Sequence, residues 1–178
     1  MLQKEILTSP KTTWAIWKLS ESASKNIISQ IDRNSINTVV EFWPWRGNIT
    51  QEILNKLWPD WKLICFEINE KDFKQHLDTL QDSRLTIHYT SCEHISEYCI
   101  DNSVDLIIST IPISLIDKNI VNIIVNKSYN SLVSGWEFIT GQYSSYAKQF
   151  MNPIFGNIHK RRHLRNIPPV CILTSKKV

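Results

Sequence analysis

The sequence predicts an α/β protein in which a mostly parallel sheet carries helices on both faces. Strand-like apolar runs alternate with amphipathic helical patterns along the 178 residues, and parallel neighbouring strands need such crossovers. A buried strand near residue 40 enters a short loop and then a helix, an arrangement that binds nucleotide-like ligands at the carboxyl edge of an open sheet. The length fits one domain with a substantial core, so we expect residues 1–178 to form a single domain.

Residues up to 109 supply four of the seven expected strands. A helix over about 20–31 begins at Ser20 or Ser22, both good N-cap residues, and repeats apolar residues on one face. Strands are then expected at 37–42, 62–67, 85–88 and 104–109, with helices at 48–57 and 70–80.

The second half completes the sheet. Its apolar patterns predict a helix at about 117–132, a strand at 137–143, a short helix near 145–151, and two late strands at 158–163 and 170–174. The last two strands are close enough in sequence to form a closing hairpin.

The loop after the first strand has tryptophan at two positions where glycine is expected. Residues 39–50 are VVEFWPWRGNIT. Glycine suits such a loop because the backbone must adopt positive φ and let a ligand pack against it. Trp43 and Trp45 instead place the two bulkiest side chains at that point.

Composition suggests a reason for this mismatch. The chain has only four glycines but seven tryptophans, whereas glycine usually makes up about 7% of a globular protein. Some genetic codes assign UGA to glycine and others to tryptophan, so we hypothesise that the tryptophans are recoded glycines. UGG codons in the gene would refute this. The alternative is a genuine, tryptophan-rich and degenerate protein. The tryptophans are Trp14, Trp17, Trp43, Trp45, Trp58, Trp61 and Trp136.

Charge and cysteine content favour a cytoplasmic protein. The formal net charge is +3, and the basic run HKRRHLR at 159–165 fits either a contact for phosphate or anionic headgroups or a solvated edge. Cys65, Cys92, Cys99 and Cys171 lack metal-site spacing and are expected to be reduced and packed. No signal sequence or run of roughly 18 apolar residues is present, so any membrane contact is expected to be peripheral.

Two acidic residues stand at strand ends. Glu67 ends the second strand, where a carboxylate can accept both ribose hydroxyls of a nucleoside, or simply face water. Glu41 ends the first strand and fits equally a role in holding the loop and one in contacting a ligand's amino group. The helix that begins at Asn48 would direct its positive end toward an anionic group.

Two further turns fall at the same predicted edge. Residues 90–93, Thr-Ser-Cys-Glu, follow the third strand and fit either an adenine contact or a simple turn. Residues 109–114 read STIPIS and follow the fourth strand. Pro112 fixes φ and removes a donor, which can aim neighbouring carbonyls at an amine, although it can equally just end the strand.

These motifs together resemble those of the soluble bacterial phospholipid N-methyltransferases. That family belongs to the class I S-adenosylmethionine (SAM) methyltransferases, close to the ribosomal RNA adenine dimethyltransferases. With glycine at 43 and 45, residues 39–50 are similar to motif I. FEIN at 66–69 fits as well, and STIPI at 109–113 is similar to the family's Ser-x-Leu-Pro motif. Segments 9–16, 142–144 and 165–169 also match. Lys18 and Leu19, where Pro-Ser is usual, and Thr90, in place of an acid, depart from the pattern.

The resemblance implies a Rossmann-like class I methyltransferase fold with SAM as its cofactor and no metal. The cofactor would lie against Glu41, Trp43, Trp45, Gly47, Asn48, Glu67, Ile68, Cys92 and Glu93. The acceptor amine would lie over Ser109, Ile111 and Pro112, and residues 1–19 would form a lid or a membrane-contact segment.

The activity implied by the resemblance is methyl transfer from SAM to an amine, foremost the phosphatidylethanolamine headgroup at the inner face of the membrane. An enzyme similar to the rRNA adenine N6-dimethyltransferases is the alternative, although those normally carry a further C-terminal helical domain. Another small or protein amine also fits. If the tryptophans are genuine, a catalytically dead SAM-fold binding module becomes the favoured interpretation.

Overall fold

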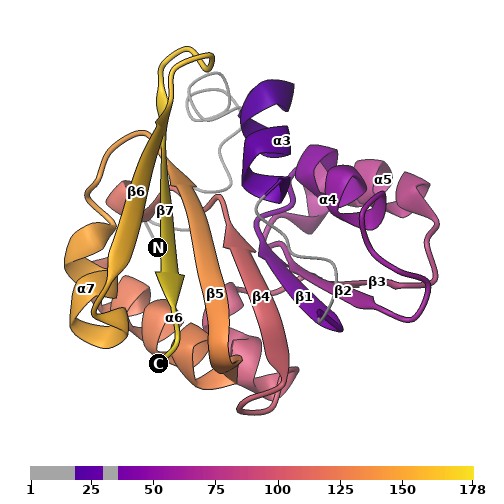
Figure 1. Ribbon diagram of the computed structural model, residues 1–178. Helices are drawn as coiled ribbons and strands as arrows, with labels where there is room; N and C mark the ends of the chain where they lie inside the picture. Colours follow the sequence, from indigo (N-terminus) through magenta and orange to yellow (C-terminus); the bar gives the residue numbers. More distant parts are fainter. Residues whose placement is uncertain (1–18, 30–35) are drawn as a thin grey trace.

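The protein's computed structural model describes residues 19–29 and 36–178. Within them, seven strands form one sheet in the order β3-β2-β1-β4-β5-β7-β6 (Figure 1). The strands are β1 (Thr38–Phe42), β2 (Lys62–Phe66), β3 (Leu85–His88), β4 (Val104–Ser109), β5 (Leu132–Gln142), β6 (Ile158–His163) and β7 (Val170–Lys176). Pairing is parallel from β3 through to β5, and β7 runs antiparallel to both β5 and β6. The predicted fold class and the closing hairpin are confirmed.

Helices connect the strands where the sequence provides caps. The helices are α3 (Glu21–Ile28), α4 (Asn48–Leu54), α5 (Glu70–Leu77), α6 (Lys118–Ser131) and α7 (Lys148–Phe155), with 3-10 turns η1 (Asp78–Leu80), η2 (Cys92–Glu97) and η3 (Ile113–Leu115). Ser20, one of the two predicted caps, accepts a hydrogen bond from the Ala23 N–H at 3.2 Å. The side chain of Asn69 caps α5 in the same way through the Asp72 N–H.

Alternation along the strands builds one apolar core on each face of the sheet. Val39 faces a core that contains residues of α3 and α4, whereas Val40 faces a core that contains residues of η2, α6 and α7. Leu106 and Ile107 of β4 divide between the two cores in the same way. Since successive strand residues point to opposite faces, both faces must be covered, as Figure 1 shows.

Several boundaries differ from the predicted ones, among them those of β5, α7 and α4. β5 begins at Leu132, five residues before the expected start, and absorbs a register shift opposite Val104 and Leu106, with Gly135 at φ 87°. α7 lies at Lys148–Phe155 rather than 145–151, because Phe155 packs in the core beyond Pro153. α4 stops at Leu54, three residues short of the expected end.

The prediction of packed, unpaired cysteines is confirmed, whereas the one about membrane contact is met only in part. All four cysteines are buried and none forms a disulfide. Among the described helices, none is long and apolar enough to cross a membrane. The expected lid or membrane-contact segment, with Trp14 and Trp17, lies outside the described residues apart from Leu19.

Candidate functional site

The carboxyl ends of β1, β2 and β4 meet at one edge of the sheet. Phe42 pairs with Phe66 on one side and with Ser109 on the other. The loop 43–47, the turn after β2 and the segment 109–112 therefore converge there, which is where open α/β sheets bind ligands.

The backbone of the loop 43–47 is left-handed at three alternate residues. Trp43 has φ 66°, Trp45 has φ 56° and Gly47 has φ 80°. An L-residue with a Cβ pays roughly 1–2 kcal/mol for this conformation, whereas glycine adopts it freely. The loop thus takes the glycine conformation at both positions where the sequence pattern called for glycine.

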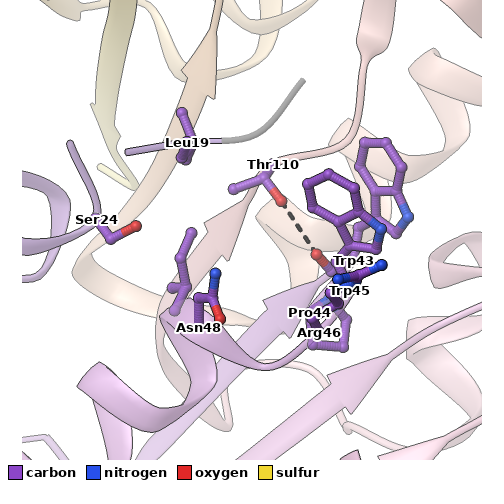
Figure 2. Close-up of a pocket in the computed structure, with 9 residues that line it drawn as sticks. Leu19, Ser24, Trp43, Pro44, Trp45, Arg46, Asn48 and Thr110 are labelled. Atoms are coloured by element: carbon purple, nitrogen blue, oxygen red, sulfur yellow. Dashed lines mark hydrogen bonds between the residues drawn. The ribbon is translucent and has the colours of Figure 1, made fainter. Parts of the chain in front are cut away.

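The two indole rings pack against each other above this loop. Their centroids are 6.1 Å apart with an interplanar angle of 24°, and Trp45 also meets Phe73 edge-on at 6.2 Å. The Trp43 N–H donates to the Phe66 carbonyl at 2.9 Å. The Thr110 hydroxyl donates to the Trp43 carbonyl at 3.1 Å, which ties the end of β4 to the loop (Figure 2).

Trp43 lies between two cavities of very different size. The smaller, about 30 Å³, is lined by residues of the loop and α4, including Trp45 and Asn48, together with Thr110 (Figure 2). The larger, about 520 Å³, opens between the ends of β2 and β3, η2 and α6. Trp43 belongs to both linings.

Glu67 is held directly beside the loop. Its side chain is buried, and its carboxylate accepts the Trp45 N–H at 3.3 Å and the Asn69 N–H at 2.9 Å. Burial raises the pKa of Glu67 to about 7, against the opposing effect of these hydrogen bonds. The site therefore offers an acidic side chain whose charge changes near neutral pH.

Glu41 lies beneath the loop rather than in either cavity lining. One carboxylate oxygen accepts the Thr50 hydroxyl at 2.7 Å, while the other is buried without a hydrogen-bond partner among the described residues. Burial raises the pKa of Glu41 to about 7. Glu41 thus braces α4 through a side chain, where a contact to the loop's N–H groups or to a ligand was predicted.

The turns after β2 and β3 line the larger cavity. Ile68 follows β2, whereas Cys92 and Glu93 follow β3. The Glu93 carbonyl accepts the Lys127 ammonium of α6 at 2.8 Å, and Ser91 caps the turn by accepting the Glu93 N–H at 3.5 Å. The predicted cofactor residues that follow β2 and β3 therefore lie together in the lining of the larger cavity.

Segment 109–112 supplies a carbonyl and a hydroxyl at the same edge. The Ile111 carbonyl accepts the buried Gln142 Nε2 at 2.7 Å, and Ile111 lines the larger cavity. The Ser109 hydroxyl is buried and makes no hydrogen bond with a described residue. Pro112 lies in neither of the two cavity linings and caps η3.

The predicted site residues thus form two groups. Trp43, Trp45, Asn48, Ile68, Cys92, Glu93 and Ile111 line the cavities, whereas Glu41, Gly47, Glu67, Ser109 and Pro112 lie behind them. Sequence analysis missed Thr50 and Gln142 as supporting residues. Thr50 could have been found from its place in the first turn after the loop, where an inward hydroxyl can reach the β1 carboxylate.

The remaining described tryptophans differ from the loop pair. Trp58, Trp61 and Trp136 do not have positive φ. Trp61 packs in the core beneath α3 and α4, and Trp58 is 56% exposed. The backbone conformation therefore favours glycine at positions 43 and 45 and does not distinguish glycine from tryptophan at the other three.

Comparison with known proteins supports the fold without naming a family. No family model matches the sequence, and no curated protein is similar to it. Solved structures do match. TrmN from Thermus thermophilus aligns with TM-score 0.75 and 15% identity over 90% of this chain, although the chain spans only 49% of that protein.

In two further matches, this chain covers most of the other protein's length. A 1,6-didemethyltoxoflavin-N1-methyltransferase from Burkholderia thailandensis, solved with S-adenosylhomocysteine, aligns with TM-score 0.76 and 12% identity over 99% of this chain and 87% of its own. An rRNA methylase from Streptococcus thermophilus gives TM-score 0.64 and 16% identity over 90% and 98%. The described chain has the Rossmann-like fold of the class I methyltransferases.

Proposed function

We propose that the protein binds SAM at the carboxyl edge of β1, β2 and β4 and transfers its methyl group to an amine of a phospholipid headgroup. The observation that carries the proposal is the left-handed backbone at positions 43, 45 and 47 beside the buried Glu67. A loop of this kind lets a ligand approach the backbone while a neighbouring acid accepts its hydroxyls.

The larger cavity fits the adenosine half of SAM. Its volume of about 520 Å³ falls within the usual range of small-molecule pockets, about 300–1,000 Å³. Ile68 and Ile111 supply apolar walls for a flat base, and Glu93 supplies a polar group. Glu67, next to the loop, is the candidate acceptor for ribose hydroxyls.

The methionine half of SAM fits only if the loop carries glycine. The cavity on that side measures about 30 Å³, and Trp43 lines both it and the larger one. Glycine at 43 and 45 would remove both indoles, enlarge the space beside the loop and relieve the left-handed backbone. We therefore take the functional protein to carry glycine at these two positions, in line with the recoding hypothesis.

The chain's own contribution to transfer is positioning. Bound SAM supplies a methyl group that is already activated, so alignment of the acceptor accounts for most of the catalysis expected. The Ile111 carbonyl accepts both the Gln142 Nε2 at 2.7 Å and the Ile113 N–H at 2.8 Å, so both of its lone pairs are used and segment 109–113 is held in place. A fixed segment at this edge would hold the acceptor in line with the methyl group.

A phospholipid is preferred because segment 109–113 is similar to the motif of the lipid enzymes. The fold alone does not distinguish between acceptor classes, since the similar solved structures are named as an rRNA methylase and a 1,6-didemethyltoxoflavin-N1-methyltransferase. An rRNA adenine is the second candidate, favoured by the basic strand β6. A headgroup amine and a base amine could both be held against the same segment.

A transfer assay tests the proposal. The double variant W43G/W45G receives labelled SAM together with phosphatidylethanolamine vesicles, phosphatidylcholine vesicles or an rRNA fragment. Label in the phosphatidylethanolamine fraction is expected, with none in phosphatidylcholine, whose nitrogen is fully methylated. W58G, which changes an exposed tryptophan, should behave as the unaltered chain. Label in the RNA alone would overturn the lipid assignment.

A further inference from the structure

We propose that the turn between β6 and β7 docks the protein on the surface of an anionic lipid bilayer. The docking turn is defined as residues 162–169, from the end of β6 to the residue before β7. The inference deepens the proposed function. It rests on that function in one respect, namely that the methyl acceptor is a lipid in a bilayer.

The docking turn exposes apolar side chains to solvent. Leu164 is 71% exposed and Ile167 is 95% exposed. Single exposed apolar residues are common on protein surfaces, but two on one tight turn form a protrusion that can enter an interface. Pro168 and Pro169 follow, and neither has an N–H that would lose hydration on entry.

A buried asparagine holds the turn in this conformation. Asn166 is only 1% exposed, and its Oδ1 accepts the Ser20 N–H at 2.6 Å. Its Nδ2 donates to the Pro168 carbonyl at 2.7 Å. Because Asn166 points inward, Leu164 and Ile167 on either side are presented outward before any partner is met.

The strand end and turn carry positive charge. Residues 158–170 contain four Lys and Arg and no Asp or Glu. Arg162 and Arg165 line an open groove of about 570 Å³ with Lys25 of α3. The ion pairs of the described residues include Lys25 with Glu21 but neither arginine. Such a groove suits the phosphates of anionic lipids.

The docking turn lies at the same edge of the sheet as the candidate site. Gln142, at the end of β5, pairs with Cys171, and His163, at the end of β6, pairs with Val170. Both strands thus end at the edge where Ser109 ends β4. Figure 1 shows the β6–β7 hairpin reaching beyond this edge near α3. A bilayer met by the turn would face the acceptor side of the site.

Vesicle flotation without SAM tests the inference on the chain as written. Phosphatidylcholine vesicles with phosphatidylglycerol should bind it, and pure phosphatidylcholine vesicles should bind it far less. L164S/I167S and R162S/R165S should each weaken binding about tenfold, since apolar insertion and basic residues contribute separately. The matched control I100S alters a residue that is 77% exposed elsewhere, and it should bind as the unaltered chain.

Three results would overturn the inference. The first is that the unaltered chain does not bind anionic vesicles. The second is that L164S/I167S binds them as well as the unaltered chain does. The third is that R162S/R165S binds an RNA hairpin more weakly while its vesicle binding is unchanged. Thermal unfolding confirms that each variant is folded. The same changes are also made in the W43G/W45G background, and the SAM affinity of these proteins is measured without vesicles. That affinity should stay the same. Failure of the docking turn can then be distinguished from failure of the cofactor site.

Discussion

Trp43 and Trp45 stack their indole rings at 6.1 Å on a backbone that is left-handed at both residues. The stacking recovers some apolar contact, but the backbone conformation opposes any residue with a Cβ. Two bulky residues in such a conformation, at the ligand edge of a class I methyltransferase fold, are the central feature of this chain.

The left-handed backbone at position 45 predicts that glycine stabilises the fold more than alanine does, the reverse of the usual order. W45G should be more stable than W45A by about 1 kcal/mol, because alanine keeps the penalty of positive φ and glycine does not. Both variants lose the same indole contacts, so the difference isolates the backbone. Chemical denaturation of the two proteins measures it.

Trp58 is the matched control for this comparison. It is exposed and its φ is not positive. There alanine should equal or exceed glycine, since glycine costs more conformational entropy on folding. Equal or greater stability of W45A over W45G would contradict the loop geometry.

Burial of Glu41 predicts a loss of stability as pH rises. Its pKa is about 7 in the folded chain and its ordinary value is 4.5. Between these values the folded state holds a proton that the unfolded state has released, so stability is greatest below 4.5 and falls until about 7, by up to about 1.4 kcal/mol per pH unit. Glu67, shifted in the same direction, adds to the slope.

E41Q should flatten this profile. Unfolding free energies of E41Q and the unaltered chain are compared from pH 5 to 8, and their difference should shift in favour of E41Q as pH rises. D101N, which changes an exposed carboxylate, should leave the profile unaltered. A parallel profile for E41Q would show that Glu41 is not buried as described.

Glu67 is predicted to bind SAM in the protein that carries glycine at 43 and 45. E67Q in that background should weaken SAM affinity about 10- to 100-fold, because hydrogen bonds to a charged group contribute about 1.5–3 kcal/mol. E70Q changes a nearby exposed carboxylate at the start of α5 and should leave affinity intact. Equal affinities for E67Q and E70Q would place the ribose elsewhere.

Gln142 is predicted to position the acceptor indirectly, because its hydrogen bond to the Ile111 carbonyl holds segment 109–113 in place. Q142L and Q142E both remove the Nε2 donor, and each should lower kcat about tenfold or more while SAM affinity stays the same. A residue that served only stability would lower the unfolding midpoint without this split. Unchanged kcat in both folded variants would show that this hydrogen bond does not position the acceptor.

Much of the fold could be predicted because its apolar pattern is regular. Val39 and Val40 face opposite cores, and the alternation continues through Leu106 and Ile107, so the strands of the central sheet lay close to their expected places. The cap at Ser20 and the glycine-like loop at 43–47 were equally visible, because both follow from local backbone requirements.

Contacts between distant segments were less visible. The start of β5 depends on a register shift against β4, and the end of α7 depends on the burial of Phe155 past a proline. The bonds of Gln142 to Ile111 and of Asn166 to Ser20 join residues far apart in the chain. No local pattern specifies such pairs, since packing and topology bring them together.

Calorimetric titration of SAM into the chain as written and into W43G/W45G tests the central claim most directly. W58G serves as the control for removal of a tryptophan outside the loop. We expect W43G/W45G to bind SAM with one site, and the unaltered chain and W58G to show no binding. If all three proteins are folded and none binds, or if the unaltered chain binds as tightly as W43G/W45G, the assignment of the loop as a glycine-requiring cofactor site is wrong.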